Sequence, residues 1–255
     1  MEWLAQHYPL NVPELVAADA ERGWTLVRDP GMGALSLSEE REAEVWYRAV
    51  RRLAEIQLET SRHTAELRHS GCPSRGLDVL ARRIPRLCSD ESAMMLGHRD
   101  GLVRREIDQV RALAPALLAL CEELASYHIP DCLDYGDLRA DGVYGAVGEP
   151  VFSDWSGSSI SHPFFAVWPL MHDAVSLLPA TSRESRRRLR DAFLAPWRVT
   201  APPEQLARAL EIARCLAPVH RAATAHAELL PSSAFTWELE TVIPTLMRRA
   251  TAQLT

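Results

Sequence analysis

The stretches Tyr135-Gly136-Asp137-Leu138 and Val151-Phe152-Ser153-Asp154-Trp155 decide how this chain is interpreted. Asp137 follows a short apolar run on a tight turn, and Asp154 ends a second predicted strand. Carboxylates at the ends of neighbouring strands can converge on one point. There one of them orients or deprotonates a hydroxyl while the other holds Mg²⁺. Gly-Asp pairs are also common in ordinary turns, so the residues alone leave both interpretations open.

The two stretches belong to a predicted β-rich insert within a body of helices. The insert covers residues 129–156, where short apolar runs alternate with turn residues. Apolar residues at i, i+3 and i+4 spacing predict helices on both sides of it. These helices cover residues 38–57, 77–87, 102–127, 166–178, 183–194, 204–220 and 235–254. Pro115 is expected to kink the third of them or to start a new segment there.

The N-terminal segment predicts a β-hairpin. Residues 1–8 are typical of the end of a helix, and prolines follow it. The apolar runs 15–18 and 24–27 are separated by acidic residues and a glycine, which is a hairpin pattern. Asp29-Pro30-Gly31 ends the second strand.

Composition excludes several function classes. The chain has 255 residues, 47% of them hydrophobic, and a net charge of −6, whereas nucleic-acid-binding domains are usually basic. The run Arg186-Arg187-Arg188 is flanked by Glu184 and Asp191, which is typical of a solvated helix face. No apolar run approaches the ~18 residues of a membrane span. Without an apparent signal peptide, and with five scattered cysteines, we expect a cytoplasmic protein with reduced thiols.

The sequence contains no lysine, so all 28 basic residues are arginines. Arginine stays protonated and cannot form a Schiff base. Pyridoxal chemistry and Schiff-base aldolase chemistry are therefore excluded for this sequence. The phosphate-binding loop that ends in Gly-Lys-Ser/Thr is excluded for the same reason.

Both aspartate stretches and their order along the chain resemble one enzyme family. Residues 135–143 resemble the His-Gly-Asp-x-His-x-x-Asn-Val brace of the aminoglycoside phosphotransferase and choline-kinase-like family. Residues 151–155 are similar to its Ile-Asp-Trp metal site, and residues 161–165 to the Ser-His-Pro segment that follows. Residues 3–15 and 24–31 resemble the part of the N-lobe that leads into the nucleotide hinge. The resemblance covers nearly the whole chain.

The resemblance implies a role for each matching residue. Asp137 would orient the acceptor hydroxyl, and Asp154, with Asp141, would hold Mg²⁺. The cofactors would be Mg²⁺ and ATP or GTP, and adenine would meet the backbone C=O of Val27 and N–H of Asp29. The implied partners are a nucleotide and a small hydroxylated substrate, with no nucleic acid and no membrane.

The chain also departs from the family pattern. Tyr135 stands at the brace histidine, and Gly142 stands at the brace asparagine, which is a metal ligand in the family. Ala166 replaces an acidic residue. The family's glycine loop and strand lysine would precede Met1. Losing one preorganised charged contact typically lowers a rate by ~10²–10³, so these departures point to weak turnover or none.

The sequence therefore predicts a protein-kinase-like α/β (α+β) fold. Residues 1–35 are expected to form a short N-lobe sheet remnant and the hinge, and residues 36–255 a large, mostly helical C-lobe. Two functions stay open. One is transfer of the γ-phosphoryl of ATP or GTP to a hydroxyl of an aminoglycoside-like molecule, an amino alcohol or a sugar, and the other is a pseudokinase-like binding or regulatory module. An exposed sheet edge would favour a homodimer.

Overall fold

The structure is a computed structural model of the chain. It describes residues 1–19, 21–31, 40–139, 142–145, 148–168, 183–230 and 241–254, without the side chains of residues 40–43. Most of the helix predicted at 166–178 and the predicted metal ligand Asp141 lie outside the described residues.

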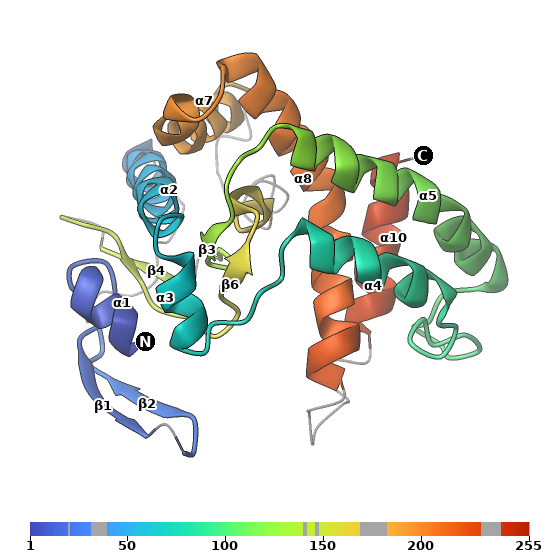
Figure 1. The fold of residues 1–255 in the computed structure, drawn as a ribbon, viewed down its shortest axis with the longest axis horizontal. Helices are drawn as coiled ribbons and strands as arrows, with labels where there is room; N and C mark the ends of the chain where they lie inside the picture. Colours follow the sequence, from blue (N-terminus) through green and yellow to red (C-terminus); the bar gives the residue numbers. More distant parts are fainter. Residues whose placement is uncertain are drawn as a thin grey trace. The chain divides into compact units, whose positions relative to one another are not determined.

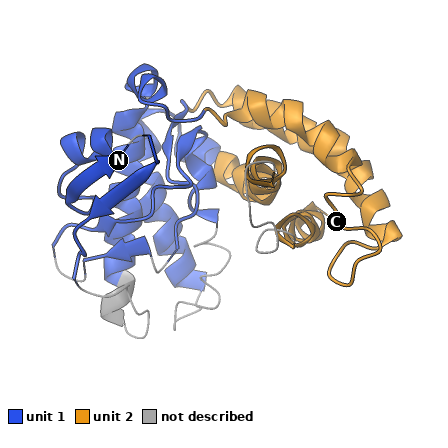
Figure 2. Ribbon diagram, turned by 90° about the horizontal axis from the view of Figure 1, so that it is seen from below, with its two compact units in different colours: residues 1–73, 130–206 blue, residues 74–129, 207–255 orange. Residues whose placement is uncertain are grey.

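The chain divides into two compact units (Figure 2). The first unit comprises Met1–Pro73 and Pro130–Leu206, and the second comprises Ser74–Ile129 and Ala207–Thr255. All the described residues to which the sequence assigns a site role belong to the first unit. The predicted boundary between an N-lobe remnant and a C-lobe near residue 35 stays a prediction.

The first unit begins with helix α1 (Glu2–His7) and a β-hairpin, as the sequence predicts (Figure 1). Strand β1 (Leu15–Asp19) pairs antiparallel with β2 (Trp24–Val27), with an irregularity in register between Leu15 and Ala17. At the turn, the N–H of Arg22 donates to the carboxylate of Asp19 at 3.0 Å. The short N-lobe sheet is therefore confirmed.

Three further helical segments of the first unit form its core. Helix α2 (Glu40–Thr60) packs against α7 (Arg183–Leu194) and against the 3-10 helix η3 (Pro196–Val199). Its apolar stripe is buried, as the i, i+3, i+4 spacing predicts, and large aromatic residues fill the space opposite it. The buried residues include Trp46, Leu53, Ile56, Phe193 and Trp197. The short helix α3 (Thr64–His69) was not predicted from the sequence.

Two small antiparallel strand pairs lie in and just beyond residues 129–156, the predicted β-rich insert. Strand β3 (Cys132–Asp134) pairs with β6 (Ser159–Ser161), and β4 (Val143–Tyr144) pairs with β5 (Val151–Phe152). A 3-10 helix, η2 (Pro163–Phe165), follows β6 and contacts β3. Asp137 lies on the turn that follows β3, and Asp154 lies on the turn that follows β5.

The second unit is helical. It contains α4 (Leu77–Ser89), α5 (Arg104–Ser126), most of α8 (Pro203–Thr224), the π-helical turn η4 (Ala225–Leu229) and α10 (Val242–Leu254). Helix α5 packs against α4 and against α10. The expectation that Pro115 starts a new segment is wrong, because α5 continues through it. No helix among the described residues is long and apolar enough to span a membrane.

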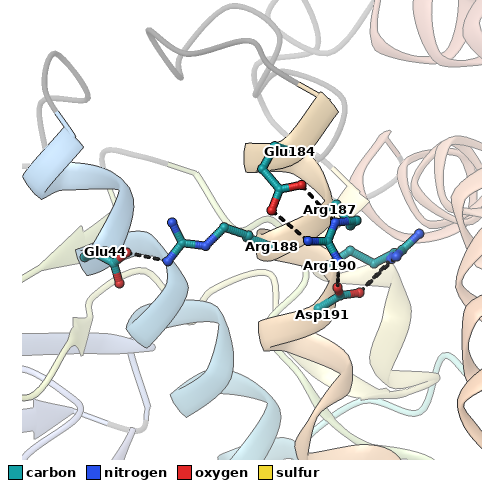
Figure 3. A network of polar contacts seen from close by, with 6 residues as sticks. All are labelled: Glu44, Glu184, Arg187, Arg188, Arg190 and Asp191. Atoms are coloured by element: carbon teal, nitrogen blue, oxygen red, sulfur yellow. Dashed lines mark hydrogen bonds and ion pairs between the residues drawn. The ribbon is translucent and has the colours of Figure 1, made fainter.

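The arginine-rich face of α7 is paired with acidic residues (Figure 3). Arg187 contacts Glu184 at 2.7 Å and Asp191 at 3.5 Å, and Arg188 reaches Glu44 of α2 at 2.5 Å. The guanidinium of Arg188 also lies 4.5 Å from the centroid of the Tyr47 ring. These ion pairs are exposed, so each contributes little to stability. The solvated helix face that the sequence predicts is confirmed, and acidic neighbours offset its positive charge.

Candidate active site

The turn that carries Asp137 depends on a glycine. Gly136 follows β3 with a φ of +92°, a backbone region that L side chains rarely adopt. A Cβ added at Gly136 would lie 2.5 Å from the carbonyl oxygen of Gly157, which follows Asp154 by three residues. The turn after β3 and the turn after β5 are therefore in backbone contact. The structure brings Asp137 and Asp154 onto adjoining turns, and Asp137 is partly exposed.

The turn that carries Asp154 is held by short local contacts. Oδ1 of Asp154 accepts hydrogen bonds from the N–H of Ser156 at 3.1 Å and from its hydroxyl at 2.6 Å. The next residue, Trp155, is buried, and its indole N–H donates to the carbonyl of Phe152 at 2.8 Å. The side chain of Asp154 is exposed. Trp155 thus anchors the end of β5 and leaves the carboxylate facing solvent.

Gly142 lies beside the end of β5 and close to the buried side chain of Tyr135. Its carbonyl accepts from the N–H of Ser153 at 2.9 Å and from the Ser153 hydroxyl at 3.2 Å. A Cβ at this position would lie 2.7 Å from the hydroxyl oxygen of Tyr135. Tyr135 packs edge-on against Trp155, with ring centroids 4.8 Å apart, and against Phe152 at 6.0 Å. The phenol therefore occupies the room next to residue 142.

The hinge residues also lie in the first unit. Val27 ends β2, pairs with Leu15 and is 37% exposed. The carboxylate of Asp29 accepts the N–H of Gly31 at 2.9 Å, which closes a small turn directly after the strand. Arg28 between them pairs with Glu14 at 2.7 Å. Their backbone groups follow a strand end, as the hinge assignment requires, and their role in nucleotide binding stays a prediction.

A buried polar cluster on α2, formed by Gln57 and Thr60, binds the backbone of β3 and of the segment after β6. The sequence analysis did not predict it. Thr60 at the end of α2 accepts the N–H of Leu133 at 3.1 Å and donates to the carbonyl of Gln57 at 2.9 Å. The amide of Gln57 donates to the carbonyl of Pro163 at 2.9 Å and lies 3.5 Å from Asp134. Both α2 residues are fully buried. The available signal was Gln57 on the apolar stripe of the predicted helix 38–57, with Thr60 three residues further along.

Thr60 provides a test of this support. Because Thr60→Val leaves the buried N–H of Leu133 without its acceptor, we expect a loss of about 1–3 kcal/mol in unfolding free energy. Thermal unfolding followed by circular dichroism measures the effect. Thr60→Ser keeps the hydroxyl and is the matched control. Equal stability of the valine and serine variants would show that the hydroxyl does not support β3.

The histidine that follows β6 has a structural role. His162 is buried, and its Nδ1 accepts the N–H of Phe164 at 3.3 Å at the start of η2. Its ring also lies edge-on to that of Phe164, with centroids 5.1 Å apart. His162 therefore packs within the core and caps the start of η2. A cavity of about 560 Å³ lies elsewhere in the unit, lined by residues of α1 and the hairpin that include Trp3, Trp24 and Asp19.

The sequence matches no profile of a known protein family, and no curated protein matches it. Solved structures do match. An ethanolamine kinase from Plasmodium vivax is 14% identical, with a TM-score of 0.60, over 98% of this chain and 69% of that one. A choline kinase from Streptococcus pneumoniae is 15% identical, with a TM-score of 0.61, over 99% and 77%. APH(2")-IIia, solved in complex with GDP and kanamycin, is 16% identical, with a TM-score of 0.54, over 100% and 80%.

These matches define the fold class. The chain has the protein-kinase-like fold of small-molecule kinases and phosphotransferases, as the sequence predicts. At such low identity the likeness shows the fold alone, and a fold does not by itself define a reaction.

The described residues do not fit the Mg²⁺ site that the fold class implies. Mg²⁺ needs oxygen ligands in near-octahedral geometry, usually one or two carboxylates together with phosphate oxygens. Asp154 offers a carboxylate, but its Oδ1 already accepts two hydrogen bonds from Ser156. Gly142 offers no side chain, and a Cβ there would lie 2.7 Å from the hydroxyl oxygen of Tyr135. Within the described ranges, no three His, Cys, Asp or Glu side chains gather as a metal site.

Proposed function

We propose that the chain belongs to the aminoglycoside phosphotransferase and choline-kinase-like family and works as a small-molecule phosphotransferase with low turnover. It would bind ATP or GTP at the hinge and pass the γ-phosphoryl to a hydroxyl of an amino alcohol, a sugar or an aminoglycoside-like molecule. The observation that carries the proposal is the backbone contact between Gly136 and Gly157, which supports adjacent placement of Asp137 and Asp154.

Asp137 has the chemistry for the acceptor side of this reaction. Its carboxylate would accept a hydrogen bond from the substrate hydroxyl and fix the direction of attack on the γ-phosphorus. It would take the proton as the new P–O bond forms, while the bond from the γ-phosphorus to the bridging oxygen breaks and ADP or GDP leaves. Such positioning is most of what a protein contributes to phosphoryl transfer. The backbone C=O of Val27 and N–H of Asp29 would bind the nucleotide base. The site has fewer groups to neutralise the charge on the transferred phosphoryl group, because the chain has no lysine and Gly142 stands at a metal-ligand position of the family. We therefore expect a low rate of transfer.

The test is single-turnover transfer from γ-labelled ATP or GTP to choline, ethanolamine and kanamycin. Asp137→Asn is expected to lower the rate by about 10²–10⁴, the usual contribution of a positioned general base. Nucleotide affinity by isothermal titration calorimetry should not change. Glu149→Gln removes an exposed carboxylate from the same insert and serves as the control.

A second candidate function is a pseudokinase-like binding module. The packing of Tyr135 over Gly142 favours it, because a family metal ligand is missing there. Nucleotide binding without transfer to any acceptor would support this candidate over the first. If the wild type binds neither ATP nor GTP at millimolar concentration, both candidates fail.

Two further expectations belong to the same proposal. The partners would be a nucleotide and a small hydroxylated substrate in the cytoplasm, with no nucleic acid and no membrane. A homodimer would cover the exposed apolar side chains of the hairpin, among them Trp24 at 67%, Leu26 at 60% and Val16 at 54% exposure. Both stay predictions.

A further inference from the structure

With Tyr135 in its present position, residue 142 has room for a glycine but not for a residue with a Cβ atom. The 2.7 Å separation between a Cβ at residue 142 and the Tyr135 hydroxyl oxygen is shorter than real Cβ contacts. Hydrogen bonds restrain the backbone of Gly142, because its carbonyl accepts two from Ser153 and its N–H donates to the carbonyl of Arg139 at 3.2 Å. Any relief must come from the tyrosine.

Tyr135 is held firmly as well. Tyr135 is 1% exposed, and its ring packs edge-on against Trp155 and against Phe152. Trp155 is itself fixed by the hydrogen bond from its indole to the carbonyl of Phe152. Moving the phenol away would disturb these three packed rings, and closely packed interiors resist such shifts. A side chain at residue 142 and the phenol of Tyr135 would therefore compete for the same space.

We propose that Tyr135 and Gly142 act as a coupled pair that removes one oxygen ligand from the site beside Asp154. The phenol takes the room of a side chain at 142, so Gly142→Asn alone cannot restore a ligand there. A shorter residue at 135 is needed at the same time. This inference rests on the proposed function, because the missing ligand is one that a phosphotransferase would use to bind a divalent cation.

The coupling is tested first on stability. Gly142→Ala is expected to lower the melting temperature by roughly 3–9 °C in the wild type, because overpacking of this kind is costly. In a Tyr135→Phe background the same substitution should cost only a small fraction of that shift, since the clashing oxygen is gone. Gly142 has no positive φ, so backbone strain does not enter. Equal shifts in both backgrounds would overturn the coupling.

The consequence for the site is tested with Mn²⁺ as a paramagnetic probe, titrated by electron paramagnetic resonance without nucleotide. The combined variant Tyr135→His, Gly142→Asn is expected to bind Mn²⁺ about 10–100-fold more tightly than the wild type. Adding Asp154→Ala should abolish the gain. If the wild type binds as tightly as the combined variant, the inference fails. Both readouts are independent of nucleotide binding and transfer, so failure of the proposed function would remain distinguishable.

Discussion

Gly136→Ala is expected to lower the free energy of unfolding by about 2–6 kcal/mol. Two costs add. An alanine at a φ of +92° is strained, and its Cβ would lie 2.5 Å from the carbonyl oxygen of Gly157. A backbone atom cannot turn aside as a side chain can, so the turns after β3 and β5 must separate. Differential scanning fluorimetry or calorimetry measures the loss as a lower melting temperature.

The chain offers a matched control for the backbone strain. Gly148 has the same φ of +92°, but an added Cβ would meet nothing within 4 Å. Gly148→Ala is therefore expected to show the strain without the clash, a loss of about 1–3 kcal/mol. The difference between the two variants isolates the contact of Gly136 with Gly157. Equal losses would mean that the two aspartate turns do not touch.

The second large effect is a pH dependence that originates in the second unit. His220 on α8 is buried, and its Nε2–H donates to the carbonyl of Arg75 at 2.9 Å. Burial is the main cause that lowers the pKa of His220 from its usual 6.5 to about 4, and the Arg75 carbonyl works against that shift. Positive charge on Arg75, Arg83 and Arg221 lowers the pKa further.

The sign follows from the two pKa values. Between pH 6.5 and about 4 the unfolded chain binds a proton at His220 and the folded chain does not. The contribution of neutral His220 to the free energy of unfolding is therefore complete above pH 6.5 and is lost as the pH drops to about 4. The loss over this window is about 3 kcal/mol from this one group.

Chemical denaturation between pH 7 and pH 4 measures this loss. His220→Gln keeps an amide donor for the Arg75 carbonyl but cannot titrate, so its stability should fall less over the same window. His98→Gln, at an exposed histidine of the same unit, is the control and should retain the wild-type pH dependence. If His220→Gln keeps the full wild-type slope, the buried histidine is not its source.

Much of the fold could be predicted from the sequence because it depends on local patterns. The periodic apolar residues of α2 and α5, and the glycine between β1 and β2, act over a few neighbouring residues. Helix α3 was missed because it is only six residues long and has little apolar periodicity. Pro115 was overestimated as a helix breaker, since tertiary packing of α5 against α4 outweighs a single lost backbone hydrogen bond.

The candidate site divides in the same way. Asp137 and Asp154 could be found from the sequence, since each follows an apolar run and the two stretches together resemble one family. The buried hydrogen bonds that hold β3 in place could not be predicted from the sequence. Gln57 and Thr60 reach Pro163 and Leu133, residues more than seventy positions away, through hydrogen bonds that no local pattern encodes.

The sequence by itself determined the residue types at the site, including the glycine at 142 and the tyrosine at 135 that depart from the family pattern. Only the tertiary structure showed that these two departures are one feature. The phenol oxygen of Tyr135 lies where a Cβ of residue 142 would approach it to 2.7 Å. The reason is physical: a sequence lists side chains one by one, whereas competition for the same volume depends on how the folded backbone turns between two residues.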